Sequence, residues 1–232
     1  MTHSVDSSII QADFDRLALL SREGWNHNSH YHSFLLNHVP SPCENALEIG
    51  CGTGAFARLL AKRAGHVLAL DLSAQMIRVA RERSAQYANL DFQLADVLSW
   101  EFPREQFDCI VSIATLHHLP LEDLLIKMKT ALCVNGTLII LDIFQGRPID
   151  ILASLVAVPV NLVLKYLKTG RIRDPREVRE AWAEHGRRDS FLTLTQIRHI
   201  CRTTLPGAKV RKHLLWRYSI IWHKTPGSSD ML

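Results

Sequence analysis

Short apolar runs alternate with helical stretches between residues 44 and 144, and this alternation predicts the architecture of the chain. Five apolar runs are expected to be strands: Ala46–Gly50, His66–Asp71, Leu90–Ala95, Phe107–Ile113 and Thr137–Ile143. Three stretches between them are expected to be helices: Ala55–Ala64, Ala74–Ser84 with Ser73 as its N-cap, and Leu121–Cys133. Buried runs joined by helices are typical of a parallel sheet with helices on both faces. Such a sheet binds its ligand at the carboxyl ends of its strands.

The two ends of the chain add elements to this sheet. Residues 9–38 have apolar positions at helical spacing, and the ring-rich segment Trp25–His32 interrupts them. Thr193–Thr203 is expected to be a helix, and Ala208–Trp216 and Tyr218–His223 an antiparallel strand pair at the sheet edge. The expected fold is therefore α/β: a doubly wound, mostly parallel seven-stranded sheet with an antiparallel last strand, N-terminal helices and a helical lid.

The composition shifts along the chain divide it into five segments. They are an N-terminal helical cap (1–44), a ligand-binding core (45–145), a helical lid (146–190), a C-terminal helix and strand pair (191–225) and a tail (226–232). Within the lid, Ile151–Leu164 is apolar, but it is too short to span a bilayer and Pro159 interrupts it. We favour a lid over an apolar small molecule. A peripheral membrane contact beside the basic flank of this stretch and a homodimer contact stay open, so the chain is expected to be a monomer or a homodimer.

Charge is distributed unevenly, although the net charge is only +4. Residues 1–164 hold 12 Lys and Arg against 17 Asp and Glu, whereas residues 165–217 hold 14 against 5. A basic surface of this kind suits an anionic substrate, a lipid surface or nucleic acid, but we favour an ordinary solvated surface. The five cysteines form no CxxC pair, which indicates buried free thiols in a reducing compartment. Because the N-terminus also lacks a signal-peptide pattern, a cytoplasmic protein is expected.

The stretch Ala46–Gly54 carries the clearest ligand-binding signal. Its glycines stand at every second position between a strand and a helix, at Gly50, Gly52 and Gly54. There they allow a ligand to approach main-chain N–H groups at the positive end of the helix. With Ala55, and with Asp71 at the distance of a ribose-binding acid, the loop also matches the dinucleotide fingerprint, so NAD is an alternative. Glu48 inside the strand opposes NAD, because a carboxylate repels a pyrophosphate and suits a ligand with a cationic end.

Several linked motifs add a family resemblance to this reading. Glu48-Ile49-Gly50-Cys51-Gly52-Thr53-Gly54 resembles motif I of the class I, Rossmann-like S-adenosylmethionine-dependent methyltransferases. Further stretches resemble the family at the expected intervals: Leu70–Met76, Leu94–Val97, Phe107–Ser112, Leu116–Leu119 and Gly136–Leu138. The resemblance covers residues 44–144 and is nearest to the branch of small-metabolite and quinone-biosynthesis enzymes. Linked motifs are a far stronger signal than one glycine pattern.

The resemblance implies that the glycine loop, with Cys51 and Thr53, passes under the methionine part of S-adenosylmethionine. Glu48 would shape the electrostatics at the ammonium group of this cofactor. The main chain from Ser112 to Ala114 would complete the amino-acid end. Asp71 would accept both ribose hydroxyls, since a carboxylate can accept two donors at once.

On the adenine side, the resemblance implies packing by Leu72 and Met76. Asp96 would accept from the adenine amino group, and the Val97 N–H would donate to the ring. The alternative for the three apolar residues is plain core packing. For Asp96, as for the ribose-side acid, the alternative is a helix cap or a turn acid.

Candidate catalytic residues flank the predicted core. His118 and His117 are expected in the loop after the fourth strand, and His118 is the first choice for a base that takes a proton from the acceptor. Lining the pocket or capping the next helix is the alternative for both. Tyr31 is expected to line the acceptor pocket. Three nearby histidines, His27, His30 and His32, offer a metal site as an alternative. No acid or cysteine at zinc-site spacing accompanies them, so no metal is expected.

These residues favour an enzyme that transfers a methyl group to O, N or C of a small, apolar or aromatic metabolite. A cofactor-binding partner protein without transfer activity stays open, because the same residues would bind the cofactor in both cases. RNA methylation is a third interpretation, supported only by the basic segment. Ser112-Ile113-Ala114-Thr115 stands where nucleic-acid amino-methyltransferases have Asn/Asp-Pro-Pro-Tyr, so nucleic acid is disfavoured as a partner.

Overall fold

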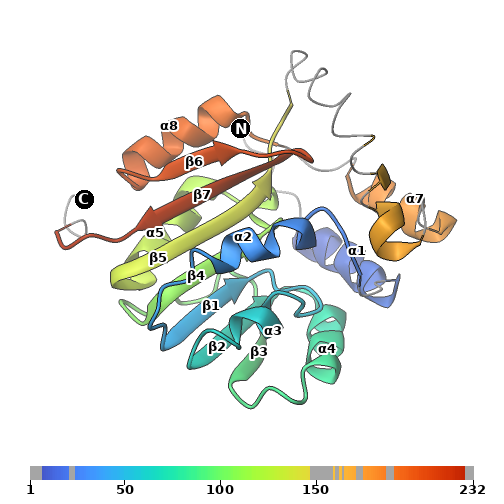
Figure 1. The fold of residues 1–232 in the computed structure, drawn as a ribbon, viewed down its shortest axis with the longest axis horizontal. Helices are drawn as coiled ribbons and strands as arrows, with labels where there is room; N and C mark the ends of the chain where they lie inside the picture. The colour runs from blue at the N-terminus through green and yellow to red at the C-terminus, as the bar shows by residue number, and fades with distance from the viewer. Residues whose placement is uncertain are drawn as a thin grey trace.

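A seven-stranded sheet in the order β3-β2-β1-β4-β5-β7-β6 forms the centre of the computed structural model (Figure 1). The structure describes residues 7–20, 24–146, 159, 162–163, 165–170, 175–186 and 191–227. The strands are β1 (Asn45–Ile49), β2 (His66–Asp71), β3 (Leu90–Leu94), β4 (Phe107–Ile113), β5 (Leu132–Ile143), β6 (Lys209–Lys212) and β7 (Arg217–His223). Strands β1 to β5 pair in parallel, and β7 is antiparallel to both β5 and β6. The expected mostly parallel sheet is therefore confirmed.

Helices cover both faces of the sheet. They are α1 (Ser7–Leu20), η1 (Ser29–Tyr31), α2 (His32–Leu36), α3 (Ala57–Leu60), α4 (Ala74–Arg83), η2 (Leu116–His118), α5 (Leu121–Ala131), α7 (Arg176–His185) and α8 (Leu194–Thr204). Alternate strand positions point to opposite faces, and the buried apolar side chains accordingly form two large clusters. One packs the sheet against α2, α3 and α4, and the other packs it against α5 and α8. This is the doubly wound arrangement that the sequence predicted.

A third, smaller cluster joins helices that are far apart in the sequence. Leu17 and Ala18 of α1 pack with Met76 of α4 and Ala181 of α7. A salt bridge of 2.9 Å between Arg16 and Glu184 also links α1 to α7. Figure 1 shows these two helices side by side, beyond the carboxyl ends of the parallel strands. They are positioned to cover the edge at which a parallel sheet binds its ligand.

Element boundaries differ from the expected ones where local packing decides them. β5 begins at Leu132 rather than Thr137, and its register with β4 shifts between Phe107 and Cys109. The first strand of the C-terminal pair is shorter than expected, because the chain turns before β7 with positive φ at Leu215 and Trp216. The expected N-cap is present, since the Ser73 hydroxyl accepts from the Met76 N–H at 3.0 Å. The five-segment division stays a prediction.

Much of the expected lid, including most of Ile151–Leu164, lies outside the described residues. The interpretations of this apolar stretch therefore stay predictions. Within the described ranges, no helix combines the length and the apolar character needed to cross a membrane.

Candidate functional site

The loop after β1 is shaped by glycines with positive φ. The φ angles are 73° at Gly50, 53° at Gly52 and 75° at Gly54, a region that other residues rarely adopt. A Cβ at Gly50 would lie 2.0 Å from Oγ1 of Thr115, so the loop packs closely against the chain that leaves β4. A Cβ at Gly52 would meet nothing within 4 Å. Gly52 therefore borders open space, which is what the cradle for a ligand requires.

Asp71 ties this loop to the neighbouring strand. It ends β2 and is 8% exposed. Its Oδ2 accepts from the Gly52 N–H at 2.7 Å, and its Oδ1 accepts from the Ser73 N–H at 2.9 Å. Burial raises the pKa of Asp71, although these main-chain hydrogen bonds oppose the rise. Each oxygen keeps further lone-pair capacity, so the carboxylate can still receive hydroxyl donors from a ligand.

Glu48 is a buried acid with an unsatisfied oxygen. It is 2% exposed, and no group among the described residues donates a hydrogen bond to its Oε2. Burial, with a contribution from Asp71 and an opposing one from Arg58, raises the pKa of Glu48 well above its ordinary value. A buried carboxylate without a donor is costly. A cationic ligand group beside it would relieve that cost, and a pyrophosphate would add to it.

The remaining cofactor-site candidates near β1 and β4 have structural partners of their own. The Ser112 hydroxyl donates to the Ile49 carbonyl at 3.1 Å and so joins the two strands. Ala114 has a φ of 52°, and its N–H donates to the Leu141 carbonyl. The thiol of Cys51 is buried, and the Thr53 carbonyl accepts from Arg58 at 3.0 Å. These contacts fix the main chain that borders the loop.

On the adenine side, the candidate residues make the contacts of a turn acid and of core packing. Asp96 is a turn acid, since its Oδ1 accepts from the Leu98 N–H at 2.9 Å. Val97 belongs to the core cluster under α5, and Met76 packs between α1 and α7. Leu72 is half-buried. Their roles at the adenine stay predictions.

His117 makes a short contact with a buried carboxylate at this edge of the sheet. Its Nδ1 lies 2.6 Å from Oδ1 of Asp142, and its main-chain N–H donates to Oδ2 at 3.0 Å. Asp142 is fully buried near the end of β5, and its Oδ1 also accepts from the Ile143 N–H at 2.7 Å. An ionised carboxylate only accepts hydrogen bonds, so Nδ1 of His117 carries the proton. The lone pair of this imidazole is therefore on Nε2.

Aromatic and imidazole rings gather around His117. The rings of His117 and His118 are 3.9 Å apart, and His118 lies 5.0 Å from the ring of His185 in α7. Phe14 of α1 contacts both His118 and His185, and Phe191 contacts His117. Burial, with His117 and His185 beside it, lowers the pKa of His118 to about 3. A base that weak is poorly matched to proton transfer near neutral pH.

The structure thus brings the predicted pair His117 and His118 together, and Asp142 orients the imidazole of His117. The sequence reasoning missed Asp142. The signal was present, because Asp142 interrupts the apolar run of β5 as Glu48 interrupts that of β1. The sequence offers His185 as a weaker candidate base, with an exposed histidine as the alternative. The structure buries it in α7, where its Nδ1 lies 3.5 Å from Oδ2 of Asp13 in α1.

The segment Trp25–His32 packs against the turn between β6 and β7. The Tyr31 hydroxyl donates to the Leu214 carbonyl at 2.6 Å, and Arg217 Nε donates to Asn28 at 2.8 Å. Burial raises the pKa of Tyr31, which disfavours the phenolate that a base would need. His27 and His30 both contact the ring of Trp25, and His32 contacts Phe56. No group of three metal-binding side chains occurs in the ranges that the structure describes.

Tyr31→Phe separates a structural from a catalytic role of this residue. We expect the free energy of unfolding to fall by about 0.5–1.5 kcal/mol, because a hydrogen bond to a carbonyl is lost. Urea unfolding measures this loss. A fall in kcat without a loss of stability would instead assign Tyr31 to the reaction.

Comparison with known proteins identifies the family to which this chain belongs. A family model described as a methyltransferase domain matches residues 46–136. An uncharacterized methyltransferase of Mycobacterium bovis is 32% identical over 207 residues, which cover 85% of this chain and 96% of that protein. A ubiquinone biosynthesis O-methyltransferase of Xanthomonas euvesicatoria is 26% identical over 160 residues, covering 63% of this chain and 66% of that protein.

A solved structure shares the fold at low sequence identity. The N-methyltransferase NodS of Bradyrhizobium japonicum, in complex with S-adenosyl-L-homocysteine, matches with a TM-score of 0.60 and 16% identity. The match covers 92% of this chain and 97% of that chain, so it includes elements on both sides of the glycine loop.

Proposed function

This chain belongs to the class I S-adenosylmethionine-dependent methyltransferases, and we propose that it methylates an oxygen or nitrogen atom of a small, apolar or aromatic molecule. The observation that carries the proposal is the contact between His117 and Asp142. A carbon acceptor that is already nucleophilic needs no base, whereas an O–H or a protonated nitrogen has a proton to lose. An oriented imidazole with its lone pair on Nε2 suits the second case.

The residues of the glycine loop fit the family's cofactor. S-adenosylmethionine supplies the methyl group as an electrophile on a sulfonium. Glu48 would face the cationic amino-acid end, because its Oε2 is buried without a donor. Asp71 would receive ribose hydroxyls while it holds the loop through the Gly52 N–H. The open space beside Gly52 leaves room for the ligand.

His117 is the residue that we propose as the base. Asp142 fixes the proton on Nδ1 and stabilises the imidazolium that forms when Nε2 takes the acceptor's proton. Two main-chain N–H groups hold this carboxylate in place, so the orientation of the imidazole does not depend on exposed side chains. Asp142 acts through His117 and is a positioning residue.

The acceptor's shape is proposed from the rings beside this base. Phe14 and Phe191 flank the histidine cluster from α1 and from the chain before α8. Phenyl rings beside these imidazoles favour an apolar or aromatic acceptor, which would bury its rings against them. The names of the relatives agree with this chemistry, since one acts in ubiquinone biosynthesis on oxygen and one on nitrogen.

Two measurements test the proposal. Isothermal calorimetry should show binding of S-adenosylhomocysteine and no binding of NAD. A screen for release of S-adenosylhomocysteine over phenols, catechols and amines should then give turnover with at least one class. Tight cofactor binding without turnover on any of these would favour the alternative, a cofactor-binding partner protein. Turnover on transfer RNA but on no small molecule would favour RNA methylation.

A further inference from the structure

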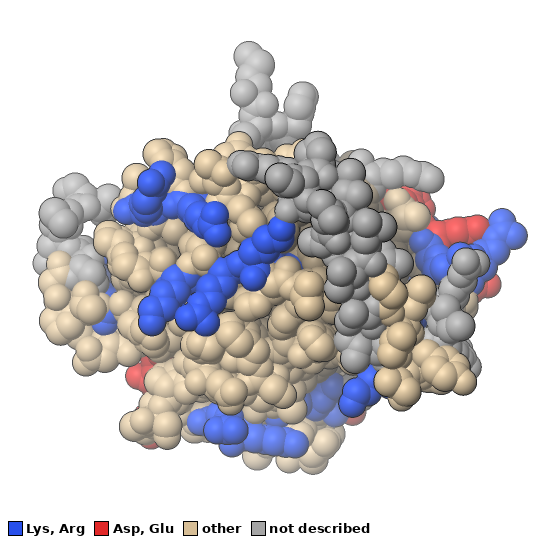
Figure 2. Space-filling view, turned by 45° about the horizontal axis from the view of Figure 1, so that its top comes forward, with Lys and Arg blue, Asp and Glu red and all other residues tan. Residues whose placement is uncertain are grey.

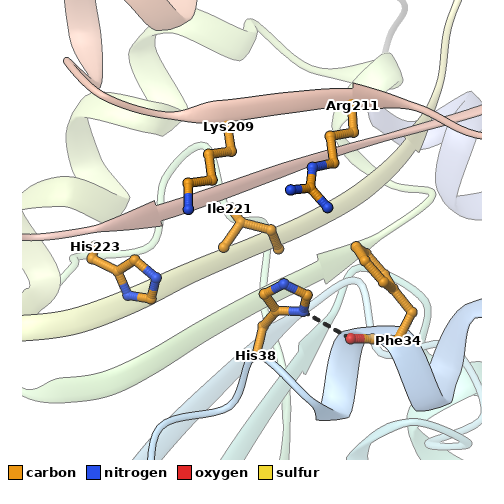
Figure 3. A pocket seen from close by; sticks show the side chains of 6 residues that line it. All are labelled: Phe34, His38, Lys209, Arg211, Ile221 and His223. Atoms are coloured by element: carbon orange, nitrogen blue, oxygen red, sulfur yellow. Dashed lines mark hydrogen bonds between the residues drawn. The ribbon is translucent and has the colours of Figure 1, made fainter.

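A shallow groove lies between α2 and the β6–β7 edge of the sheet (Figure 3). Phe34 and Ile221 form its apolar floor. Lys209 and Arg211 of β6 extend over this floor, and the imidazoles of His38 and His223 complete the lining. Lys209 and Arg211 share one face because they are two residues apart in a strand. Among the described residues, neither has an acidic partner.

The two chain segments that supply the groove lining carry no acid. Residues 24–43 and 191–223 contain no Asp or Glu. The cationic side chains that line the groove are those of Lys209 and Arg211. Figure 2 shows Lys and Arg side chains crossing this part of the surface with no acidic side chain between them. These two cations make the groove locally positive, and no described residue forms a salt bridge with either of them.

The groove is separate from the proposed cofactor site. Ile221 and His223 lie in β7, whereas the glycine loop follows β1, and β4 and β5 lie between these two strands. Three strand spacings of about 4.8 Å give a separation of roughly 14 Å across the sheet. A ligand in the groove would leave the glycine loop open.

We propose that this groove docks a carboxylate-rich segment of another protein. An apolar floor inside a cationic rim has the anatomy of a protein interface. The guanidinium fork of Arg211 matches a carboxylate, and Lys209 adds a second donor. Lys209 and Arg211 are exposed, so a small free anion beside them would stay hydrated and screened. Two copies of this chain are disfavoured, because pairing at β6 would bring like charges together.

The test uses fluorescence anisotropy with a defined probe. The probe is a labelled amphipathic helix of about 20 residues with glutamates on one face and leucines on the other. Its matched control carries glutamine in place of glutamate, and a single-stranded RNA oligonucleotide is the third probe.

The protein variants are Lys209→Glu/Arg211→Glu and Lys62→Glu/Arg63→Glu. The second pair is exposed, follows α3 and makes the same change in net charge.

The acidic peptide should bind the wild type and the Lys62/Arg63 variant equally, and the groove variant at least about tenfold more weakly. Binding should weaken with salt, and the glutamine peptide should not bind. An equal loss of affinity for the acidic peptide in both variants would overturn the proposal. The absence of any binding of this peptide to the wild type would also overturn it. Tighter binding of RNA that the groove variant abolishes would also overturn it, in favour of nucleic acid. Unchanged affinity for S-adenosylhomocysteine verifies that the groove variant is folded.

Discussion

Replacing Asp142 with asparagine is expected to lower kcat roughly 10²–10⁴-fold, the range that general-base catalysis supplies. The carboxylate accepts from Nδ1 of His117 and from two main-chain N–H groups. An asparagine amide has one oxygen and one donor group, so it cannot satisfy all three. If its NH₂ faces the imidazole, the proton moves to Nε2 and the lone pair that would take the acceptor's proton is lost. Steady-state kinetics measures kcat and KM separately.

The affinity for S-adenosylhomocysteine should change little in Asp142→Asn, because the contacts of the glycine loop are made elsewhere. Some stability is expected to be lost, since a buried polar site becomes mismatched. The variant is therefore compared with the wild type below its own unfolding temperature. A KM increase with unchanged kcat would show that Asp142 shapes the acceptor pocket without orienting a base.

The choice between the two histidines rests on their glutamine variants. His117→Gln should lower kcat roughly 10²–10⁴-fold, because the proposed base is removed. His118→Gln should leave the pH–rate profile near neutral pH unchanged, because burial lowers the pKa of His118 to about 3 and its imidazole is already neutral there. If His118→Gln abolishes turnover and His117→Gln preserves it, the base is His118, as the sequence alone suggested.

The sequence predicts the sheet well because its strands are marked by local composition. β2 and β4 have the expected boundaries residue for residue. Each is a run of apolar residues that is buried on both faces, so no partner from elsewhere has to be known. The errors fall where pairing decides the boundary. β5 extends back to Leu132 through pairing with β4, and β6 ends at Lys212 because of the turn into β7.

The glycine loop was predictable for the same reason, since its motif is contiguous. The contacts on the acceptor side were not predictable from the sequence. The orientation of His117 depends on Asp142, which is 25 residues away in the sequence and reaches it by strand pairing. The rings of Phe14 and His185 meet only because α1 packs on α7. Such contacts depend on tertiary packing that no local spacing encodes.

Gly52→Ala is expected to lower the affinity for S-adenosylhomocysteine at least about tenfold, which corresponds to about 1.4 kcal/mol of binding free energy. With φ at 53°, a Cβ strains the main chain. The Cβ also enters the open space beside the loop, because no protein atom lies within 4 Å of it. The methyl group would therefore occupy room that the cofactor needs. Isothermal calorimetry measures the change in affinity.

Gly207→Ala is the matched control for backbone strain. Gly207 also has a positive φ, of 83°, and open space around its Cβ position, but it lies in the turn before β6. Both variants should lose about 1–2 kcal/mol of unfolding free energy from the left-handed conformation. Only Gly52→Ala should lose cofactor affinity. Equal stability losses with unchanged affinity in both variants would show that the ligand does not approach the loop at Gly52, and the proposed position of the cofactor would then be wrong.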